Sequence, residues 1–443
     1  MGSPSIFERF PEELRHLALS YCDSSTIHHL CLTSKAVYNV CINSLFHTID
    51  LSTHNSGEWR RHKTYSNFHV PPDYGKALHT LQDMRLVERQ ANLMLLLERH
   101  LENLDNPKPS IALKTRCLRW TCTEPEESPR EIRNYGLGQP WDTFSCFTKL
   151  IEIDIGFMAG TKEIVTPPSH LFSTTTSISL SGVTSHRVVS SILTSISAAN
   201  LKHLRLNNLQ LFADEPHILQ NLAPTQIALY RRDRPGPIQG YLHDLTGHCT
   251  SLRSFHYLST AEYFDGSYTS NPHTRARWTL QVTDENSRYA ELASFIDSVK
   301  PTLREFYFEH GPDIDYFGTA FSQRFHGSFT RQTLTVPLPM DRFFDTHVLP
   351  ILTAGPWPKL QTMTVKGIGH WKPVDAWSAD ATPAEVAWLH AKTRAFREKV
   401  LGIWEAVGEG CAVLVGDEAG RPFYRLWDDR GVNGRGTDGY DRV

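Results

Sequence analysis

Cysteine, histidine and acidic side chains are the residues from which a metal or nucleophilic site would be built. The chain contains eight cysteines: Cys22, Cys31, Cys41, Cys117, Cys122, Cys146, Cys249 and Cys411. None forms a Cys-x-x-Cys pair, and no histidine follows at the spacing of a zinc finger. We therefore expect reduced, mostly buried thiols that behave as small apolar residues, with neither a metal site nor a disulfide.

Motifs of enzyme families are absent from the sequence. It has no phosphate-binding loop, no Gly-x-Ser-x-Gly and no His-Glu-x-x-His. Gly367-Ile-Gly369 lacks the third glycine of a dinucleotide-binding loop, and the 22 histidines are scattered. We expect a protein that is not an enzyme and holds no cofactor. A hydrolase or transferase remains an alternative, and it would need a deep pocket with converging polar groups.

A set of polar and aromatic side chains suits a different chemistry, the recognition of a protein surface. They lie between or just beyond the apolar residues of a short repeated pattern, so they would share the exposed face of a series of strands. The candidates for substrate binding on this concave face are Arg205, Asn207, Tyr230, His256, Tyr307, Glu309 and Lys366. They show no charge bias that would identify the partner.

The repeated pattern consists of two apolar residues at positions i and i+2. A third residue, often apolar as well, stands at position i−3. Its clearest copy is Leu201-x-x-Leu204-x-Leu206-x-x-Leu209. The first apolar residue of the pair recurs at positions 118, 153, 178, 204, 227, 255, 306, 334 and 363. The interval from 255 to 306 is two periods, which predicts a further copy at Arg277-x-x-Leu280-x-Val282.

Periods in the twenties with this pattern are typical of leucine-rich repeats. Helical patterns at 187–196 and 289–299 each precede a strand, as a right-handed crossover between parallel strands requires. We therefore expect an α/β fold in which a three-helix unit is followed by an irregular solenoid. The solenoid would be a horseshoe of about ten short parallel strands with outer helices. A doubly wound α/β enzyme is the alternative.

Three short amphipathic patterns follow one another between residues 10 and 46. Leu14, Leu17, Ala18 and Tyr21 fall at i, i+3, i+4 and i+7 of the first helix, which Pro11 begins. Asp23 to Ser25 and then Thr33 with Ser34 supply N-caps for the next two helices. Three helices in so few residues form a small core, so we expect an apolar face to be buried on a neighbouring domain or a partner.

These residues resemble the F-box family, in particular its fungal-type members with leucine-rich repeats. The family opens with Leu-Pro-x-Glu-(Leu/Ile), and this chain has Phe10-Pro11-Glu12-Glu13-Leu14. Leu-Ser-Tyr-Leu-Asp is matched by residues 19–23, Leu-x-Leu-x-Ser-Lys by 30–35, and Leu-(Phe/Tyr)-x-x-Ile-Asp-Leu by 45–51. Phe10 and Cys22 replace a leucine and a large aliphatic residue, and both remain apolar.

The resemblance implies the substrate-recognition subunit of a Skp-cullin-F-box ubiquitin ligase. The first helices would bind a Skp-type adaptor, and through it a cullin, while the repeats would hold an unknown protein substrate. The adaptor-binding residues would be Phe10, Pro11, Leu14, Leu17, Ile27, Leu30, Leu32, Ser34, Val37 and Leu45. A leucine-rich-repeat scaffold without a ligase role is the alternative. Its helical cap would bury the same apolar faces against residues 93–104.

The domains expected are an F-box at 5–52, a linker and joining helix at 53–112, and the repeat array at 113–370. A capping helix and hairpin at 371–430 and a disordered tail at 431–443 would follow. Within these segments we expect helices at 74–104 and from Pro383, and a hairpin of 411–415 with 422–427.

The composition favours a cytoplasmic or nuclear protein that binds neither nucleic acid nor membranes. Hydrophobic residues make up 40% and charged residues 21%, and the net charge is −3. The longest apolar run, Leu93 to Leu97, is far shorter than the roughly 20 residues that span a bilayer. The first residues contain no apolar stretch that would serve as a secretory signal.

Overall fold

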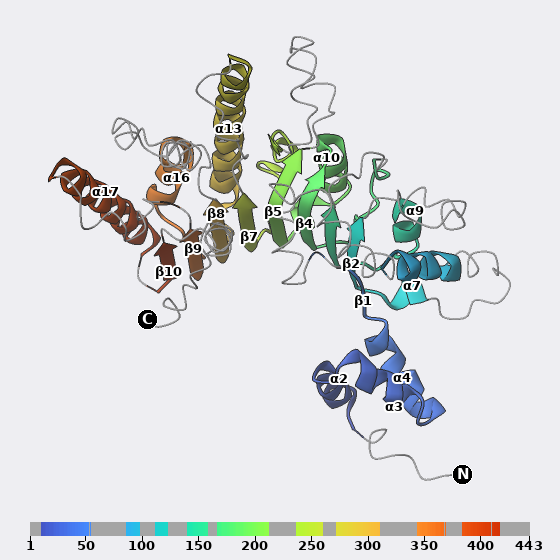
Figure 1. Cartoon of the computed structure of the whole chain (residues 1–443). Coiled ribbons are helices and arrows are strands. Elements are labelled where there is room, and N and C mark those ends of the chain that lie inside the picture. The colour runs from blue at the N-terminus through green and yellow to red at the C-terminus, as the bar shows by residue number, and fades with distance from the viewer. Residues whose placement is uncertain are drawn as a thin grey trace, which may run out of the picture. The chain divides into compact units, whose positions relative to one another are not determined.

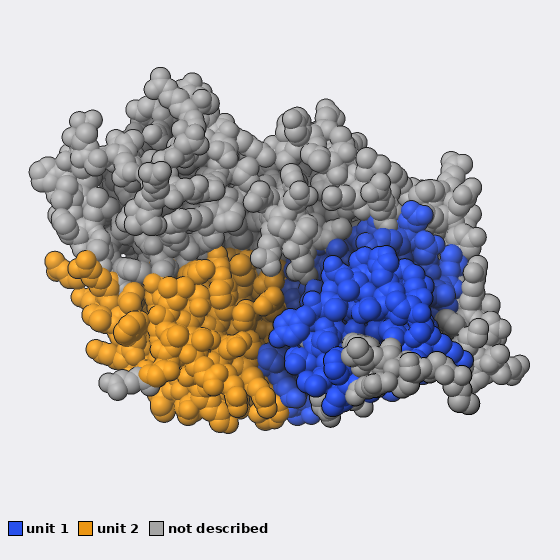
Figure 2. All heavy atoms as spheres, turned by 90° about the horizontal axis from the view of Figure 1, so that it is seen from below, with its two compact units in different colours: residues 1–60, 70–203 blue, residues 61–69, 204–443 orange. Residues whose placement is uncertain are grey.

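The strands of this α/β protein lie parallel, and helices alternate with them along the chain (Figure 1). The computed structural model describes residues 10–52, 54, 86–97, 111–122, 140–157, 166–211, 236–259, 272–310, 343–366, 368, 383–408 and 410–416. Two compact units divide the chain (Figure 2). Unit 1 comprises residues 1–60 and 70–203, and unit 2 comprises residues 61–69 and 204–443.

Unit 1 begins with a group of three helices, called the helical head here: α2 (Glu12–Ser20), α3 (Ser24–Cys31) and α4 (Lys35–Leu45). Its strands pair in parallel in the order β1-β2-β3-β4. They are β1 (Thr48–Leu51), β2 (Cys117–Cys122), β3 (Glu152–Phe157) and β4 (Ser177–Thr184). The connecting helical elements are residues 86–97, α7 (Ile111–Lys114), α9 (Pro140–Ser145), α10 (His186–Thr194) and η2 (Ala198–Asn200).

Apolar pairs two residues apart hold these strands to their helices. Leu118, Ile153 and Ile178 are aligned across β2, β3 and β4, and each is at most 1% exposed. Trp120 stands in the next row and contacts Phe144 of α9 edge to face, with ring centroids 5.2 Å apart. Successive side chains of a strand point to opposite faces. The residue that separates the two members of each apolar pair therefore lies on a second face of the strands. We call it the polar face.

Unit 2 repeats the arrangement. Its strands are β5 (His203–Leu211), β7 (Ser254–Ser259), β8 (Glu305–His310), β9 (Thr362–Lys366) and β10 (Ala412–Gly416), which are neighbours in that order. The short β6 (Gly236–Pro237) is antiparallel to β5. The helical elements are η3 (His243–Leu245), α13 (Pro272–Val299), the π-helical turn η5 (Phe344–Val348), α16 (Leu349–Thr353) and α17 (Pro383–Val407).

Aromatic side chains fill the core of unit 2. Phe255 of β7 lies against Phe295 of α13, with ring centroids 5.0 Å apart, and Phe308 of β8 lies 5.4 Å from Phe344 of η5. Met363 and Val365 of β9 continue the same two rows and are fully buried. The apolar pair therefore faces the helices in unit 2 as it does in unit 1.

The structure confirms the repeat pattern as strands at seven places: β2, β3, β4, β5, β7, β8 and β9. The copies at 227 and 334 lie outside the described residues. The strand expected at 277–282 is wrong, because these residues belong to α13 and β7 pairs directly with β8. The same helix continues through Leu292, Phe295, Ile296 and Val299, which have helical spacing. A short apolar pair alone cannot distinguish a strand from a buried helix.

Both ends of the strand series extend beyond the expected repeats. β1 forms at the exit of the helical head and pairs with β2, and no strand was expected there from the residue pattern. Residues 412–416, expected in a hairpin, pair in parallel with β9, and the other half of that hairpin lies outside the described residues. The helices expected at 187–196, at 289–299 and from Pro383 are confirmed. The joining helix is confirmed for residues 86–97, and the rest of it lies outside the described residues.

Candidate functional site

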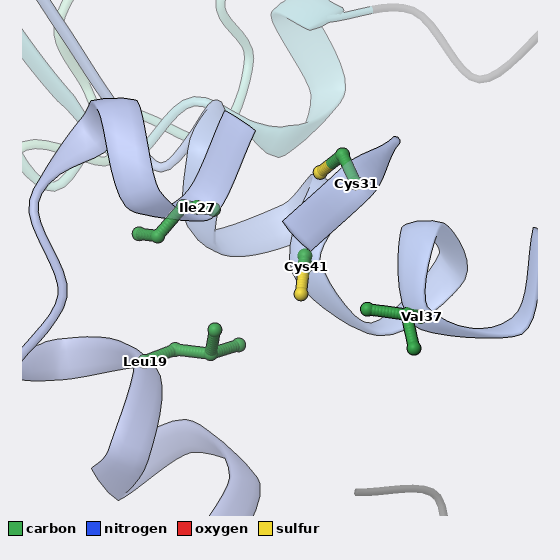
Figure 3. Packing of buried hydrophobic residues seen from close by; sticks show 5 residues of the cluster. All are labelled: Leu19, Ile27, Cys31, Val37 and Cys41. Carbon is green, nitrogen blue, oxygen red and sulfur yellow. The ribbon is translucent and has the colours of Figure 1, made fainter. Parts of the chain in front are cut away.

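The helical head packs around five buried side chains: Leu19, Ile27, Cys31, Val37 and Cys41 (Figure 3). Capping fixes the starts of two of its helices. Asp23 accepts a hydrogen bond from the Thr26 amide at 2.6 Å, and Ser34 accepts one from the Val37 amide at 3.1 Å. Burial raises the pKa of the Cys41 thiol, which therefore stays protonated at neutral pH. The head thus has its own core, although a small one.

A stripe of large apolar side chains on the head remains exposed. Phe10, Leu14, Leu17 and Tyr21 recur at intervals of three or four residues along α2 and its ends, so they share one face of the helix. Phe10 is 43% exposed, Leu14 50%, Leu17 53% and Tyr21 84%. We call these four residues the α2 stripe. Leu32, between α3 and α4, is 71% exposed.

The expected adaptor-binding residues therefore separate into two groups. Phe10, Pro11, Leu14, Leu17 and Leu32 are exposed. Ile27 and Val37 belong to the core, Leu30 and Leu45 are half-buried and pack against it, and Ser34 is a helix cap. Tyr21, which lies on the same helical spacing as Leu14 and Leu17, was not among the expected adaptor-binding residues. Tyr38 of α4, 44% exposed, carried no signal in the sequence.

Backbone and side-chain contacts join the head to the strands of unit 1. The carbonyl of His47, just after α4, accepts hydrogen bonds from the amides of Arg116 and Cys117 at 2.9 and 3.0 Å. Gln90 of the 86–97 helix donates to the carbonyls of Leu51 and Thr121 at 3.2 and 2.9 Å. Gln90 is only 4% exposed, so these bonds are shielded from water. The exit of the head is therefore bonded to the start of β2, and the 86–97 helix is bonded to β1 and β2.

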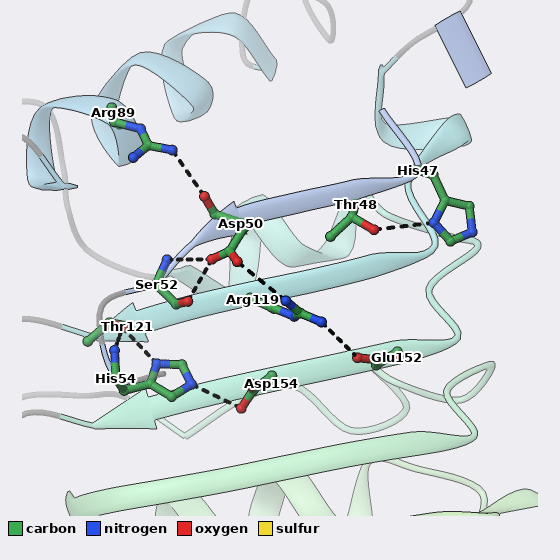
Figure 4. Close-up of polar contacts among 10 residues, drawn as sticks. All are labelled: His47, Thr48, Asp50, Ser52, His54, Arg89, Arg119, Thr121, Glu152 and Asp154. Atoms are coloured by element: carbon green, nitrogen blue, oxygen red, sulfur yellow. Dashed lines mark hydrogen bonds and ion pairs between the residues drawn. The ribbon is translucent and has the colours of Figure 1, made fainter. Parts of the chain in front are cut away.

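The polar face of unit 1 carries charged and hydrogen-bonded side chains in register. Arg119 of β2 lies between Asp50 of β1 and Glu152 of β3, at N···O distances of 3.5 and 3.9 Å (Figure 4). All three side chains are at least 40% exposed, so these ion pairs contribute little stability. Together they form a solvated surface with one cation between two anions.

His54, just beyond β1, is the buried centre of a second network on this face. Its Nδ1 lies 2.8 Å from Oγ1 of Thr121, and its Nε2 lies 3.0 Å from Oδ1 of Asp154 (Figure 4). The imidazole covers Gly156, where any Cβ would come within 2.3 Å of the ring. His54 is 3% and Thr121 0% exposed, so this hydroxyl–imidazole–carboxylate series is buried. It joins the segment just beyond β1 to β2 and β3.

The polar face of unit 2 brings four of the expected substrate-binding residues together. The imidazole of His256 stacks on the ring of Tyr307, with centroids 5.4 Å apart and planes 15° apart. The Tyr307 hydroxyl donates to Glu309, and the Lys366 ammonium lies 5.6 Å from the Tyr307 ring centroid. Glu309 and Lys366 are register partners on β8 and β9. These contacts hold the Tyr307 ring in place on the polar face.

The other three expected residues are less well defined. Arg205 is exposed and Asn207 is half-buried on β5, while Tyr230 lies outside the described residues. The buried His54 network was not expected from the sequence. Its only signal was Gly156, two residues after Asp154, where a glycine in a strand indicates a close approach of another group.

Neither the described residues nor a comparison with known proteins points to a further functional site. In the part of the chain that the structure describes, no cluster of three or more His, Cys, Asp or Glu side chains could hold a metal ion. Among the same residues, no helix is both long and apolar enough to cross a membrane. No model of a protein family matches the sequence, and no curated protein is detectably similar to it.

Proposed function

We propose that this chain is an F-box-type subunit that recruits a protein substrate to a Skp-cullin-F-box ubiquitin ligase. The helical head would dock on the Skp-type adaptor, and the polar face of the strands would bind the substrate. The observation that carries the proposal is the α2 stripe: four large apolar side chains, 43–84% exposed, on a unit that has already formed a core.

Leaving such side chains exposed costs free energy that a partner could recover. Burying a leucine or phenylalanine contributes roughly 1.5–3 kcal/mol relative to leaving it in water. Three of the stripe residues, Phe10, Leu14 and Leu17, are half-exposed on one helix face. Apolar side chains at i, i+4 and i+7 are the usual anchors of a helix that packs into a groove or against a second helix. The stripe thus has the spacing and composition of a docking face.

For the recognition part we propose an irregular leucine-rich-repeat solenoid. The parallel strands, the alternating helices and the period of the apolar pairs support it. In such a fold the polar face is the recognition surface, and the stacked His256–Tyr307 pair with Lys366 would be its most ordered part. The chain would supply proximity and orientation and no covalent chemistry.

The contacts of His47 and Gln90 give this division of labour a physical basis. A recruiting subunit must present its substrate at a fixed place relative to the adaptor. At its exit the head accepts hydrogen bonds from residues 116 and 117 through His47, and buried bonds of Gln90 join the 86–97 helix to β1 and β2. We infer that the first strands of unit 1 move with the head as one body.

The test is binding of the full chain to a purified Skp-type adaptor. Leu14→Ala combined with Leu17→Ala should weaken binding by a factor of about 100, within a range of roughly 30 to 1,000, at roughly 1–2 kcal/mol for each anchor. Leu113→Ala is the matched control, because Leu113 is 46% exposed on α7 and outside the stripe. It should bind as the wild type does.

The scaffold alternative makes the opposite prediction. It requires the apolar face of α2 to be covered within the monomer by the 93–104 segment. Leu14 and Leu17 are at least 50% exposed, and Leu96 is itself 38% exposed, which favours docking on a separate protein. If the wild-type chain ignores the adaptor, the ligase proposal fails and the scaffold is preferred.

A further inference from the structure

Helix α17 has one face that packs on unit 2 and an opposite face that does not. The packed face is defined by its contacts. Lys399 forms an ion pair with Asp345 of η5 at 2.6 Å, and Gly402 faces Thr353 of α16 so closely that a Cβ would lie 3.3 Å from its methyl group. Ile403 of the same face is fully buried. With about 3.6 residues per turn, the opposite face passes through Leu401.

That opposite face carries an exposed stripe, which we call the α17 stripe: Arg394, Arg397, Leu401, Trp404 and Glu405. Leu401 and Trp404 are each 58% exposed, which is high for side chains of this size. Tryptophan and arginine are also the residue types most enriched at the energetic centres of protein interfaces. The stripe is therefore a candidate contact surface, and its charges indicate what would cover it.

The α17 stripe has a polarity along the helix. Two arginines stand at its N-terminal end, the apolar pair stands in the middle, and Glu405 stands at its C-terminal end. Glu398 lies on the flank, four residues after Arg394, and compensates part of the positive charge within the same helix. A surface that is positive at one end, apolar in the centre and negative at the other is complementary to itself when turned end for end.

We propose that α17 is a self-association site at which a second copy of this chain packs in antiparallel orientation. In a two-fold pair centred on Leu401, the same patch faces itself. Arg397 lies four residues before Leu401 and Glu405 four residues after it, about 6 Å in each direction at 1.5 Å per residue. Glu405 of each copy then stands level with Arg397 of the other, with Arg394 one turn farther along. Leu401 and Trp404 of both copies meet in the middle.

The size of the stripe sets the strength of the contact. Residues 394–405 span roughly 17 Å of helix, which is a small interface. We therefore expect a reversible dimer with a dissociation constant in the micromolar range, and not an obligate one. The α17 stripe shares no residue with the α2 stripe. Failure of the dimer would therefore leave the adaptor proposal in place, and failure of adaptor binding would leave the dimer proposal in place.

Charge reversal on the full chain tests the proposal, with sedimentation velocity as the readout. Glu405→Arg places like charges at both ends of the pair, and so does Arg394→Glu combined with Arg397→Glu. Each of these variants should dimerise at least about tenfold more weakly than the wild type. Mixed in equal amounts, they should form a heterodimer, because every pair of ends is then again of opposite charge. This rescue cannot arise from misfolding.

Apolar substitutions complete the test. Leu401→Asp should abolish the dimer, whereas Leu414→Asp should leave it unchanged, because Leu414 is 56% exposed on β10 and lies outside the α17 stripe. Thermal unfolding should be unaffected by either change, since both side chains are exposed. A wild-type chain that stays monomeric at about 100 µM overturns the proposal. So does a mixture of the two charge-reversed variants that associates no better than either alone.

Discussion

Replacing Gly156 by alanine should displace His54 from its buried site and loosen the first strands of unit 1. An alanine Cβ at this position would lie 2.3 Å from Cγ and 2.4 Å from Nδ1 of the imidazole, closer than any real contact. The φ angle of Gly156 lies outside the left-handed region, so alanine meets no backbone strain there. The whole effect should therefore come from the clash with His54.

The magnitude follows from the two hydrogen bonds that the imidazole would lose. The bond to the Thr121 hydroxyl contributes about 1 kcal/mol, and the bond to the Asp154 carboxylate about 1.5–3 kcal/mol. Gly156→Ala should therefore lower the free energy of unfolding by about 3 kcal/mol. His54→Ala should cost a similar amount, because it removes the same two bonds.

The double variant makes this reasoning testable. Once His54 is alanine, the space above Gly156 is empty and the new methyl group fits. Gly156→Ala in that background should cost almost nothing, which gives a coupling free energy of about 3 kcal/mol between the two sites. Amide hydrogen exchange of residues 48–54 and 117–122 at increasing urea concentration measures the local stability. Additive losses in the double variant, or a fully stable Gly156→Ala protein, would refute the reasoning.

Three further outcomes are expected elsewhere in the molecule. Val37→Ala should destabilise the helical head by about 1–3 kcal/mol, measured as faster amide exchange of residues 12–45, whereas Leu14→Ala should leave that exchange unchanged. Burial raises the pKa of Cys122 to about 12. The thiol loses its proton near pH 9 in the unfolded chain but only near pH 12 in the folded one. Its contribution to stability is therefore fully present below pH 9 and is lost as the pH rises further. Stability should then fall by about 1.4 kcal/mol per pH unit between pH 9 and 12, and Cys122→Ala should remove that slope in urea titrations. Lys300 is 7% exposed, and its ammonium donates to the carbonyls of Ile351 and Ala354 at 3.2 and 2.7 Å. Lys300→Met should therefore lower the melting temperature by several degrees, because it leaves two carbonyls at the end of α16 without this donor.

Much of the fold could be predicted because its signal is periodic. An apolar pair such as Leu204 and Leu206, repeated at intervals in the twenties, predicts a buried strand face whatever lies between the copies. The failure at Leu280 and Val282 has a physical reason. The pair is too short to separate a strand from a helix, and the spacing of 51 residues between β7 and β8 is occupied by α13. Counting periods could not reveal that a helix had replaced a repeat.

The candidate sites were predictable to different degrees. Helical spacing predicts that Leu14 and Leu17 share one face. Which apolar side chains are exposed and which, like Ile27 and Val37, are buried depends on how three helices meet, and spacing alone does not determine that. The His256–Tyr307 stack follows once both are placed on neighbouring parallel strands in register. The contact of His54 with Asp154 joins residues 100 positions apart. It also requires a glycine at position 156, because the imidazole lies directly against that residue. No local pattern encodes such a contact.

We propose that the α2 stripe docks on a Skp-type adaptor. Isothermal titration calorimetry of the full chain against that adaptor tests it most directly, with wild type, Leu14→Ala/Leu17→Ala and Leu113→Ala compared side by side. We predict one-to-one binding by the wild type and by Leu113→Ala, with a loss of about 100-fold in the stripe variant. Equal binding by all three proteins, or no binding by the wild type, would contradict the assignment of the head as an adaptor-docking module.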